Sequence, residues 1–287
     1  MSCKGSSSRA SSLPAIPPED ETVASRGSGL QIHCSDGVAT VTLNRPEHLN
    51  AMTPGLMGAL RAEVEALACD PEVRALVLTG AGRAFSSGGD RGFLESLLLA
   101  SREEIENTVY TSFQGAVKAV KTFPHPTVAA VNGPAVGAGC ELAVACDFRI
   151  AAEGAVFIES WVNLGVIAPL GGMSLLPRIV GLARAAEMLM LGKPVEAEEA
   201  LRIGLVTEVV PGDDLDAAVE RLAGRLAAGP PLALAAMKAG LQRAEDSTLE
   251  SEWQAGVEAQ VRLIGSRDLG EAVRAALEQR RPRFEGR

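Results

Sequence analysis

The 287-residue sequence contains few aromatic residues, with two tryptophans, one tyrosine and seven phenylalanines. Proteins that bind single-stranded nucleic acids stack bases on aromatic side chains, so this composition argues against such a surface. The 27 basic residues are outnumbered by 36 acidic ones, which gives a formal net charge of −9. This charge disfavours broad binding to nucleic acids or anionic membranes, although a local basic patch could hold an anionic ligand. We expect no nucleic-acid partner.

The sequence also lacks the patterns of metal, disulfide and membrane proteins. Its five cysteines are odd in number without Cys-x-x-Cys spacing, and its three histidines lie at unrelated positions. We therefore expect neither a disulfide framework nor a metal site. No apolar run approaches the roughly 20 residues that a membrane-spanning helix needs, and no signal-peptide pattern is present. These absences predict a cytoplasmic protein in a reducing compartment, without a membrane span.

Composition divides the chain into three parts. Residues 1–27 are rich in Ser, Pro and Gly, and we expect them to form a disordered tail. Residues 28–194 alternate between strand and helix patterns and are predicted to form the core with the ligand site. Residues 195–287 carry helical patterns punctuated by Pro211-Gly212 and Gly229-Pro230-Pro231. This last part is predicted either as an assembly region or as a helical layer packed on its own sheet.

Apolar runs rich in β-branched residues predict the strands. They cover residues 38–43, 73–79, 127–131, 146–151 and 155–158. Helical spacing follows Thr53-Pro54, an N-cap and first-turn proline, and it recurs further along the chain. The later helices are predicted at 102–122, 196–201, 215–227, 231–244, 249–264 and 269–279. Alternating strands and helices with nearly all-apolar strands predict an α/β fold whose largely parallel sheet is covered on both faces.

Two glycine-rich segments, 82–90 and 132–141, each follow a predicted strand, and the second leads into an apolar helix. Small residues let the backbone approach a ligand closely, and the N–H groups at a helix start have no intrahelical acceptor. One N–H from each segment could converge on a carbonyl oxygen and stabilise an oxyanion. Alternatively, each segment is only a tight turn. The phosphate-loop, dinucleotide and serine-hydrolase motifs are absent.

Short motifs from about Leu30 to the C-terminus match a known family in order and spacing. They are Leu43-Asn44-Arg45-Pro46, Asn50-Ala51, Ala84 to Asp90, Pro126 to Gly133, Gly137 to Leu142, Cys146-Asp147, Leu164-Gly165, Gly171-Gly172, Pro177-Arg178, Gly181, Ala200, Gly204-Leu205-Val206 and Arg281 to Phe284. With them the chain resembles the crotonase (enoyl-CoA hydratase/isomerase) superfamily. The resemblance implies a crotonase-like spiral of ββα units with a C-terminal helical trimerisation region, assembled as a homotrimer or a dimer of trimers.

The resemblance also implies an acyl-CoA thioester as substrate, with coenzyme A as part of that substrate and no separate cofactor. The backbone N–H groups of Gly89 and Ala138 would form the oxyanion hole for the thioester oxygen. Arg83 and Arg91 would face the phosphates of coenzyme A, unless they are only solvated loop cations. The full set of implied coenzyme A and acyl contacts is Arg45, Arg83, Ala84, Ser86, Ser87, Gly88, Asp90, Arg91, Gly92, Gly137 and Trp161.

The chain departs from the family at one of its two catalytic glutamates. Glu141 falls on the first position, but the second falls on Trp161, whose indole is an N–H donor without a titratable proton near neutrality. Trp161 is therefore expected to shape the acyl pocket. Glu159 points the same way from an extended segment, about 6–7 Å along it, and could replace the missing carboxylate. We expect it instead to lie on the surface.

These residues favour an enoyl-CoA hydratase in which Glu141 is the single general acid and base. Isomerisation of an enoyl-CoA and hydrolysis of an acyl-CoA are alternatives that also need only one carboxylate. Because Trp161 replaces an acid, a non-catalytic acyl-CoA binding protein is the competing class. For Glu141 itself, the alternative is a helix N-terminal carboxylate that only stabilises the helix dipole. The length and substituents of the acyl chain are not encoded in any motif.

Overall fold

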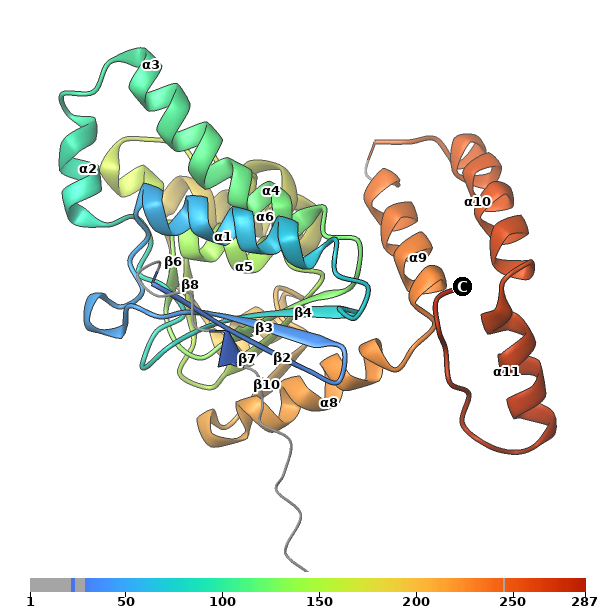
Figure 1. The fold of residues 1–287 in the computed structure, drawn as a ribbon. Coiled ribbons are helices and arrows are strands. Elements are labelled where there is room, and N and C mark those ends of the chain that lie inside the picture. Colours follow the sequence, from blue (N-terminus) through green and yellow to red (C-terminus); the bar gives the residue numbers. More distant parts are fainter. Residues whose placement is uncertain (1–21, 24–28, 245) are drawn as a thin grey trace, which may run out of the picture.

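The computed structural model describes residues 22–23, 29–244 and 246–287 (Figure 1). Apart from Thr22–Val23, which forms the short strand β1, the predicted tail over residues 1–27 lies outside the described residues. Within the described ranges, no helix is both long enough and apolar enough to cross a membrane.

A seven-stranded sheet forms the centre of the structure (Figure 1). In spatial order it consists of β1, β2 (Leu30–Ser35), β3 (Val38–Leu43), β4 (Ala75–Gly80), β5 (Thr127–Val131), β7 (Phe148–Ala152) and β10 (Glu208–Val210). The first three strands are antiparallel, and every pair from β3 to β10 is parallel. The predicted largely parallel sheet is confirmed.

A second, smaller sheet lies next to the glycine-rich segments. It contains β6 (Ala135–Val136), β8 (Val156–Ile158) and β9 (Val195–Glu196). β6 and β8 are parallel, whereas β8 and β9 are antiparallel. This sheet holds the second glycine-rich segment beside the residues that follow β8, and so it positions the candidate site.

Helices cover both faces of the main sheet, as predicted. α8 (Leu215–Ala227) packs on one face, against alternate residues of β4, β5 and β7. The other face is covered by α1 (Pro54–Leu67), α4 (Gly115–Lys121) and α5 (Ala138–Ala145). α1 begins as its sequence predicts, because the Thr53 hydroxyl accepts a hydrogen bond of 3.2 Å from the Leu56 N–H and Pro54 occupies the first turn.

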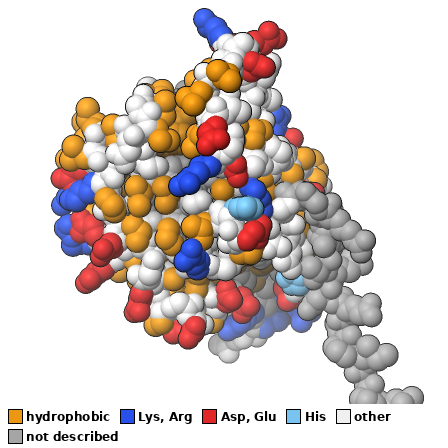
Figure 2. Space-filling view, turned by 90° about the vertical axis from the view of Figure 1, so that its left-hand side faces the viewer, with side chains coloured by type: hydrophobic (Ala, Val, Ile, Leu, Met, Phe, Trp, Pro, Cys, Tyr) orange, Lys and Arg blue, Asp and Glu red, His pale blue; other side chains and the backbone are white. Residues whose placement is uncertain are grey.

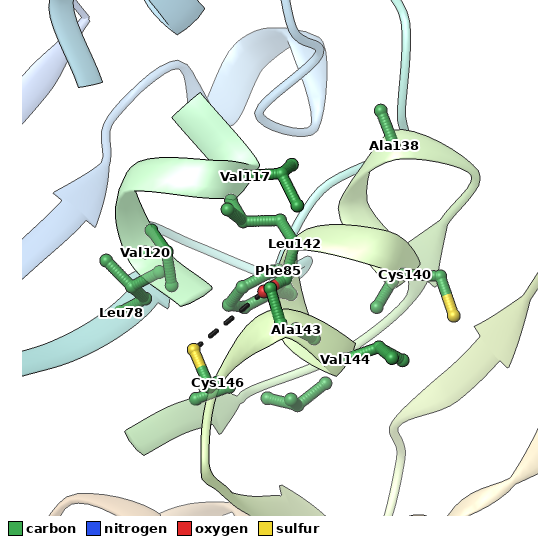
Figure 3. Close-up of a cluster of buried hydrophobic side chains, with 14 of the residues drawn as sticks. Leu78, Phe85, Val117, Val120, Ala138, Cys140, Leu142, Ala143, Val144 and Cys146 are labelled. Atoms are coloured by element: carbon green, nitrogen blue, oxygen red, sulfur yellow. Dashed lines mark hydrogen bonds between the residues drawn. The ribbon is translucent and has the colours of Figure 1, made fainter. Parts of the chain in front are cut away.

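α5 is buried along its whole length, which explains why it is apolar on every side. In Figure 3, Leu142 of α5 lies among Leu78, Phe85, Val117 and Val120 from the strand, loop and helix around it. The buried Cys146 closes the helix and its thiol lies 3.8 Å from the Leu142 carbonyl oxygen. A rigid apolar α5 holds the residues of its first turn in fixed positions.

The segment predicted as one helix over 102–122 is helical over 102–121 but changes its winding. It contains α3 (Arg102–Ile105), a π-helical stretch η2 (Glu106–Gln114) and α4. α2 (Arg91–Leu97) precedes it. The short turns of 3-10 helix are η1 (Pro46–His48), η3 (Ser160–Leu164) and η4 (Gly212–Asp214). Nothing in the apolar spacing of this region signals a π-helix, so the sequence predicted an ordinary helix.

α6 (Gly172–Leu191) was not expected from the sequence. Its interruption by Gly181, which has φ of +78° and ψ of 159°, divides it into two shorter helices. α7 (Ala197–Arg202) follows β9. Both β10 and α8 lie beyond residue 194 yet belong to the main sheet and its cover, so the structure extends the sheet layer past the predicted boundary.

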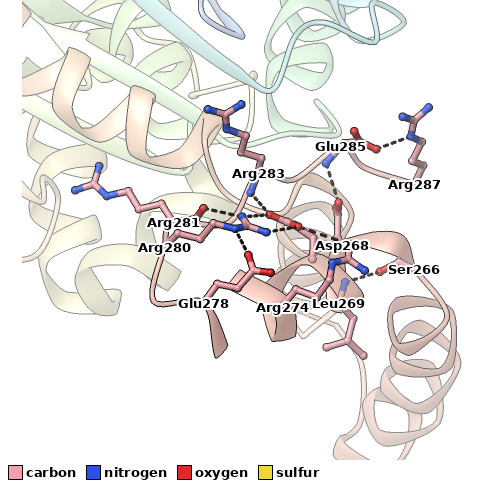
Figure 4. A network of polar contacts seen from close by, with 11 residues as sticks. Ser266, Asp268, Leu269, Arg274, Glu278, Arg280, Arg281, Arg283, Glu285 and Arg287 are labelled. Carbon is pink, nitrogen blue, oxygen red and sulfur yellow. Dashed lines mark hydrogen bonds and ion pairs between the residues drawn. The ribbon is translucent and has the colours of Figure 1, made fainter. Parts of the chain in front are cut away.

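α9 (Pro231–Arg243), α10 (Leu249–Ile264) and α11 (Arg267–Leu277) stand beside the main sheet (Figure 1). Lys238 of α9 is buried and its ammonium lies 2.7 Å from a carboxylate oxygen of Asp147, which fixes α9 to the core. Asp268 of α11 accepts a backbone hydrogen bond from Glu285 at 2.7 Å, which Figure 4 shows, and another from Gly286 at 3.0 Å. The C-terminal segment is thereby tied to α11.

Candidate functional site

The two glycine-rich segments meet in space, which composition alone could not predict. The Ser86 N–H donates to the Pro134 carbonyl at 3.1 Å, and the Val136 N–H donates to the Ser86 carbonyl at 2.9 Å. A Cβ built on Gly139 would stand 2.8 Å from the Ser86 side chain, so only glycine fits there. The two segments therefore run side by side over several residues.

The backbone N–H groups of Gly89 and Ala138 lie at the end of this contact. A Cβ built on Gly88 would be 2.7 Å from the Val136 oxygen and 3.7 Å from the Ala138 nitrogen, so the two loops adjoin here. Within the described ranges, neither the Gly89 nor the Ala138 N–H has an acceptor. Two such unsatisfied donors on neighbouring loops can together bind one oxygen atom.

Each of these two donors is held by its neighbours. Met52 brackets the Gly89 peptide, because its N–H donates to the Gly88 carbonyl at 2.7 Å and its carbonyl accepts from Asp90 at 2.9 Å. Ala138 follows Gly137, which has φ of +52° and donates its N–H to the Ile158 carbonyl at 2.7 Å. A positive φ favours glycine at this position. The donors are thus fixed before any ligand arrives.

Several of the predicted contact residues hold the loop together in the structure. The buried Ser86 hydroxyl donates to the Asn50 carbonyl at 2.8 Å and accepts from the Gly88 N–H at 3.1 Å. Asp90 caps α2 by accepting from the Gly92 N–H at 3.0 Å. The Arg45 guanidinium lies 3.5 Å from the Asp90 carboxylate and donates to the Ala51 carbonyl. Asp90 and Arg45 therefore shape the loop from within.

Other predicted contact residues are open to solvent. Arg83, Arg91 and Gly92 are exposed, and no ion pair joins either arginine to another described residue. Ser87 is half-buried with its hydroxyl 3.4 Å from the His48 carbonyl, and Ala84 is buried beneath the loop. The exposed arginines leave two positive charges available beside the loop.

Asn50 belongs to the Asn50-Ala51 motif, and the structure gives it a role that the sequence did not predict. It is fully buried, and its amide nitrogen donates to the Ala81 and Ala84 carbonyls at 2.9 and 2.8 Å. Its side-chain oxygen accepts from the Arg45 N–H at 2.9 Å. A single asparagine thereby satisfies three backbone groups of the loop. A polar residue between apolar neighbours is the only signal of this in the sequence.

Glu141 lies in the first turn of α5, fully buried. Its Oε1 accepts hydrogen bonds from the Leu170 N–H at 3.0 Å and the Gly172 N–H at 2.7 Å, whereas its Oε2 has no partner among the described residues. Burial raises the pKa of Glu141 to about 7, although these backbone N–H groups and the Trp161 indole act in the opposite direction. A carboxyl that titrates near neutrality can both take and return a proton.

Trp161, in the position of the family's second glutamate, lies half-buried against the oxyanion segment. A Cβ on Gly137 would be 3.7 Å from its ring. Its indole Nε1 is buried and has no hydrogen-bond partner of ordinary geometry among the described residues. The bulk of Trp161 therefore borders the site, and its indole N–H lies near the carboxyls of Glu141 and Glu159.

The prediction that Glu159 lies on the surface is wrong. Glu159 is 0% exposed, and neither of its carboxyl oxygens has a partner of ordinary hydrogen-bond geometry among the described residues. It follows β8, where Phe157 is buried and its two neighbours are half-buried, so it shares the buried face of Phe157. Burial, together with the charge of Glu141, raises the pKa of Glu159 to about 8.

The surface around α2 and α3 is mixed in character. Figure 2 shows this side of the molecule, where hydrophobic side chains lie between basic and acidic ones. Leu98 and Leu99, directly after α2, are among the exposed large hydrophobic residues. No group of three or more His, Cys, Asp or Glu side chains within the described ranges is arranged to hold a metal ion.

Comparison with known proteins gives a consistent result. The profile of the enoyl-CoA hydratase/isomerase family matches residues 33–287. A 1,2-epoxyphenylacetyl-CoA isomerase of Escherichia coli is 36% identical over 256 residues, which cover 89% of this chain and 97% of the relative. A crotonyl-CoA hydratase of Syntrophomonas wolfei is 34% identical, covering 86% of this chain and 94% of the relative. The crystal structure of an enoyl-CoA hydratase from Bacillus anthracis superposes with a TM-score of 0.86 at 30% identity, covering 90% of this chain and 100% of that one.

Proposed function

Because the chain belongs to the enoyl-CoA hydratase/isomerase family, we propose that it is a hydratase that adds water to a 2-enoyl-CoA thioester. Membership confirms the crotonase-type fold that the sequence predicts, and it makes the protein an acyl-CoA-processing enzyme. The observation that carries the choice of reaction is the buried Glu141 carboxyl beside the two adjoining N–H donors.

The Gly89 and Ala138 N–H groups are proposed to bind the thioester oxygen. Nucleophilic attack at the β-carbon of an enoyl thioester moves negative charge onto that oxygen, and donors already in place stabilise it without reorganisation. This role is supported by the finding that neither N–H has an acceptor within the described ranges. Removing one such donor from an enzyme typically costs about 10²–10³ in kcat.

Glu141 is proposed to act as general base and then as general acid. As its carboxylate takes one proton from water, the water oxygen forms the C–O bond at the β-carbon and the π electrons move toward the thioester oxygen. The enolate then collapses, its α-carbon takes the proton from Glu141, and the carboxylate is restored. Two backbone N–H groups donate to Oε1, so Oε2 is the oxygen that accepts the proton from water and returns it to the α-carbon. A pKa of about 7 suits both halves of this cycle.

The coenzyme A part is proposed to lie along the loop from Arg83 to Gly92, with no further cofactor. Arg83 and Arg91 are exposed there and their charges can meet the phosphates, which explains how an acidic protein binds an anionic substrate. Trp161, against Gly137, is proposed to border the acyl pocket.

Isomerisation is the second candidate, because the Escherichia coli relative is a 1,2-epoxyphenylacetyl-CoA isomerase. Trp161 counts against it, because isomerases of the family usually rely on the second glutamate position, which Trp161 occupies. A double-bond shift needs one group that removes a proton from one carbon and returns it to another, which Glu141 could also do. Hydrolysis would instead release free coenzyme A, and an acyl-CoA binding protein would release no product.

A homotrimer or a dimer of such trimers is proposed as the assembly, and the cytoplasm as the location. Support for self-association comes from exposed hydrophobic residues in α10, including Trp253, Val257 and Val261, each more than 60% exposed in the single chain. Light scattering on the purified protein checks the assembly, and a monomer would contradict it.

Mass spectrometry of the products tests the proposed reaction. The protein is incubated separately with saturated, 2-enoyl and 3-enoyl CoA esters. Hydration predicts a gain of one water on the 2-enoyl ester and no change to the saturated one. A shifted double bond without a mass change would establish isomerisation, free coenzyme A would establish hydrolysis, and unchanged esters would exclude catalysis on these substrates.

A further inference from the structure

Four buried polar atoms that have no hydrogen-bond partner of ordinary geometry among the described residues lie beside the start of α5. They are Glu141 Oε2, both carboxyl oxygens of Glu159 and the Trp161 indole Nε1. Buried polar groups in folded proteins are almost always hydrogen-bonded, and leaving one unpaired destabilises the folded state. A group of such atoms in one place therefore points to a functional arrangement.

The backbone explains why Glu159 reaches this place. The Ile158 carbonyl accepts the Gly137 N–H at 2.7 Å, so the residue after β8 lies directly beside the residue that precedes α5. Glu159 then faces the first turn of α5, where the Cys140 thiol and the Glu141 carboxyl lie. In Figure 3, the Cys140 side chain points away from the apolar cluster around Leu142.

We propose that Glu141 and Glu159 form a carboxyl pair that carries one negative charge and one proton near neutral pH, with the charge on Glu141 and the proton on Glu159. The second carboxyl that the family keeps at the position of Trp161 is replaced here by a carboxyl that enters from the end of β8. This inference rests on the proposed function for its effect on turnover, whereas the pair itself can be observed without substrate.

Every group that faces the pair can be named. From α5, the Cys140 thiol faces Glu159, and burial raises the pKa of that thiol, so it stays neutral. From η3, the Trp161 indole N–H is near both carboxyls, and from the start of α6 the backbone N–H groups of Leu170 to Gly172 face Glu141. No Lys or Arg of the described part is among them. The two carboxyls therefore have only each other as charged neighbours.

Two carboxyls in one apolar place cannot both ionise easily, because the first negative charge opposes the second. Glu141 carries the backbone N–H groups on Oε1 and so ionises first, while Glu159 keeps the remaining proton. When Glu141 is ionised and Glu159 is protonated, the Glu141 carboxylate is in the form that can accept a proton from water. The pair thereby keeps Glu141 in this base form near neutral pH without touching the coenzyme A loop.

The test is an infrared titration of the protonated carboxyl C=O band in the ligand-free protein. It compares the wild type with Glu159→Gln, Glu141→Gln and the control Glu153→Gln, which changes an exposed glutamate in the turn before β8. Difference spectra between wild type and each variant assign the bands. The pair predicts a shift in one direction: Glu141→Gln lowers the titration midpoint of Glu159 by about one pH unit or more, as loss of a nearby like charge does. Glu159→Gln leaves the midpoint of Glu141 unchanged, because Glu159 is still neutral when Glu141 ionises. Glu153→Gln leaves both midpoints unchanged.

An unchanged midpoint of Glu159 in Glu141→Gln would overturn the pair. So would a band that titrates at the ordinary pH of an exposed carboxyl in the wild type. Should Glu159→Gln fail to fold, the shift of Glu159 in Glu141→Gln still decides the question. With substrate, Glu159→Gln leaves the acidic limb of the kcat profile, where Glu141 ionises, in place and removes the alkaline limb, where Glu159 ionises, while KM stays unchanged. A merely structural Glu159 would lower kcat at every pH without removing the alkaline limb, and absence of turnover on all esters would refute the hydratase while leaving the infrared result intact.

Discussion

The Glu141 Oε1 atom accepts a hydrogen bond of 2.7 Å from the backbone N–H of Gly172, the first residue of α6. A Cβ built on Gly172 would stand 2.9 Å from the same oxygen and 3.2 Å from the Glu141 Cγ. The start of one helix thus fixes a carboxyl on another, and it does so at a distance that only glycine allows. The orientation of Glu141 depends on this contact.

Gly172→Ala is expected to displace the Glu141 side chain while leaving the fold intact, because the atoms that must move belong to one side chain. A hydrogen bond to a charged group contributes about 1.5–3 kcal/mol, so we expect kcat to fall by about 10–100-fold. Steady-state kinetics and a melting curve measure the two effects. Gly154→Ala is the matched control, because no atom lies within 4 Å of its added Cβ. Full activity of Gly172→Ala would show that the contact does not orient Glu141.

Gly88→Ala is expected to damage the oxyanion loop itself. Its added Cβ would lie 2.7 Å from the Val136 carbonyl oxygen, and its φ of +88° is unfavourable for alanine. Strain of this kind costs about 1–3 kcal/mol, and we expect a lower Tm together with a loss of kcat. In contrast, Gly58→Ala in the middle of α1 meets no atom within 4 Å and should stabilise the protein by about 0.5–1 kcal/mol. Equal melting temperatures for Gly88→Ala and Gly58→Ala would contradict the close contact between Gly88 and the Val136 carbonyl.

The stability of the protein should decrease as the pH rises through neutrality. Burial raises the pKa of Glu141 to about 7 and that of Glu159 to about 8, from an ordinary value of 4.5. Between 4.5 and about 8 the folded state therefore binds more protons than the unfolded state, so the free energy of unfolding falls with pH. Below 4.5 the contribution is fully present, and above about 8 it is lost.

Calorimetry at a series of pH values measures this dependence. We expect Glu159→Gln to remove part of the decrease in Tm between about pH 5 and about pH 8, because one of the two groups no longer titrates. Glu153→Gln should keep the wild-type slope, since Glu153 is exposed. A wild-type Tm that rises over this interval would contradict the burial of the two carboxyls.

Arg83 and Arg91 should contribute to the binding of coenzyme A. Each is exposed beside the loop, and an exposed ion pair is worth about 0.2–1 kcal/mol. Arg83→Gln and Arg91→Gln are therefore expected to raise KM about 1.5–5-fold each with kcat unchanged, and the effect should shrink at high salt. Arg225→Gln, on the exposed side of α8, is the control. A KM that does not change in either variant would show that the phosphates lie elsewhere.

Local signals in the sequence predicted most elements because each has a direct physical cause. Thr53 and Pro54 start α1, and the apolar residues of β3 and β5 define strands whose bounds match the structure. The π-helical stretch before α4 and the whole of α6, with its kink at Gly181, escaped prediction. Both depend on packing between elements, which a single segment does not encode.

The burial of Glu159 escaped prediction for a similar reason. An extended segment places residues i and i+2 on one face, but the sequence does not say which face another element covers. Phe157 carried the missing signal, because its apolar side chain shares a face with Glu159 and marks that face as buried. Likewise, the glycine-rich segments could be identified from composition, whereas their contact through Ser86 and Val136 required the fold.

Replacement of Glu141 by glutamine is the most direct test of the account. The variant keeps the size of the side chain but cannot accept a proton, and general acid–base catalysis typically contributes about 10²–10⁴-fold. We predict that Glu141→Gln lowers the rate of water addition to a 2-enoyl-CoA ester by this factor, while calorimetry shows that it still binds a saturated acyl-CoA like the wild type. Wild-type hydration rates in Glu141→Gln would contradict the central role of this carboxyl.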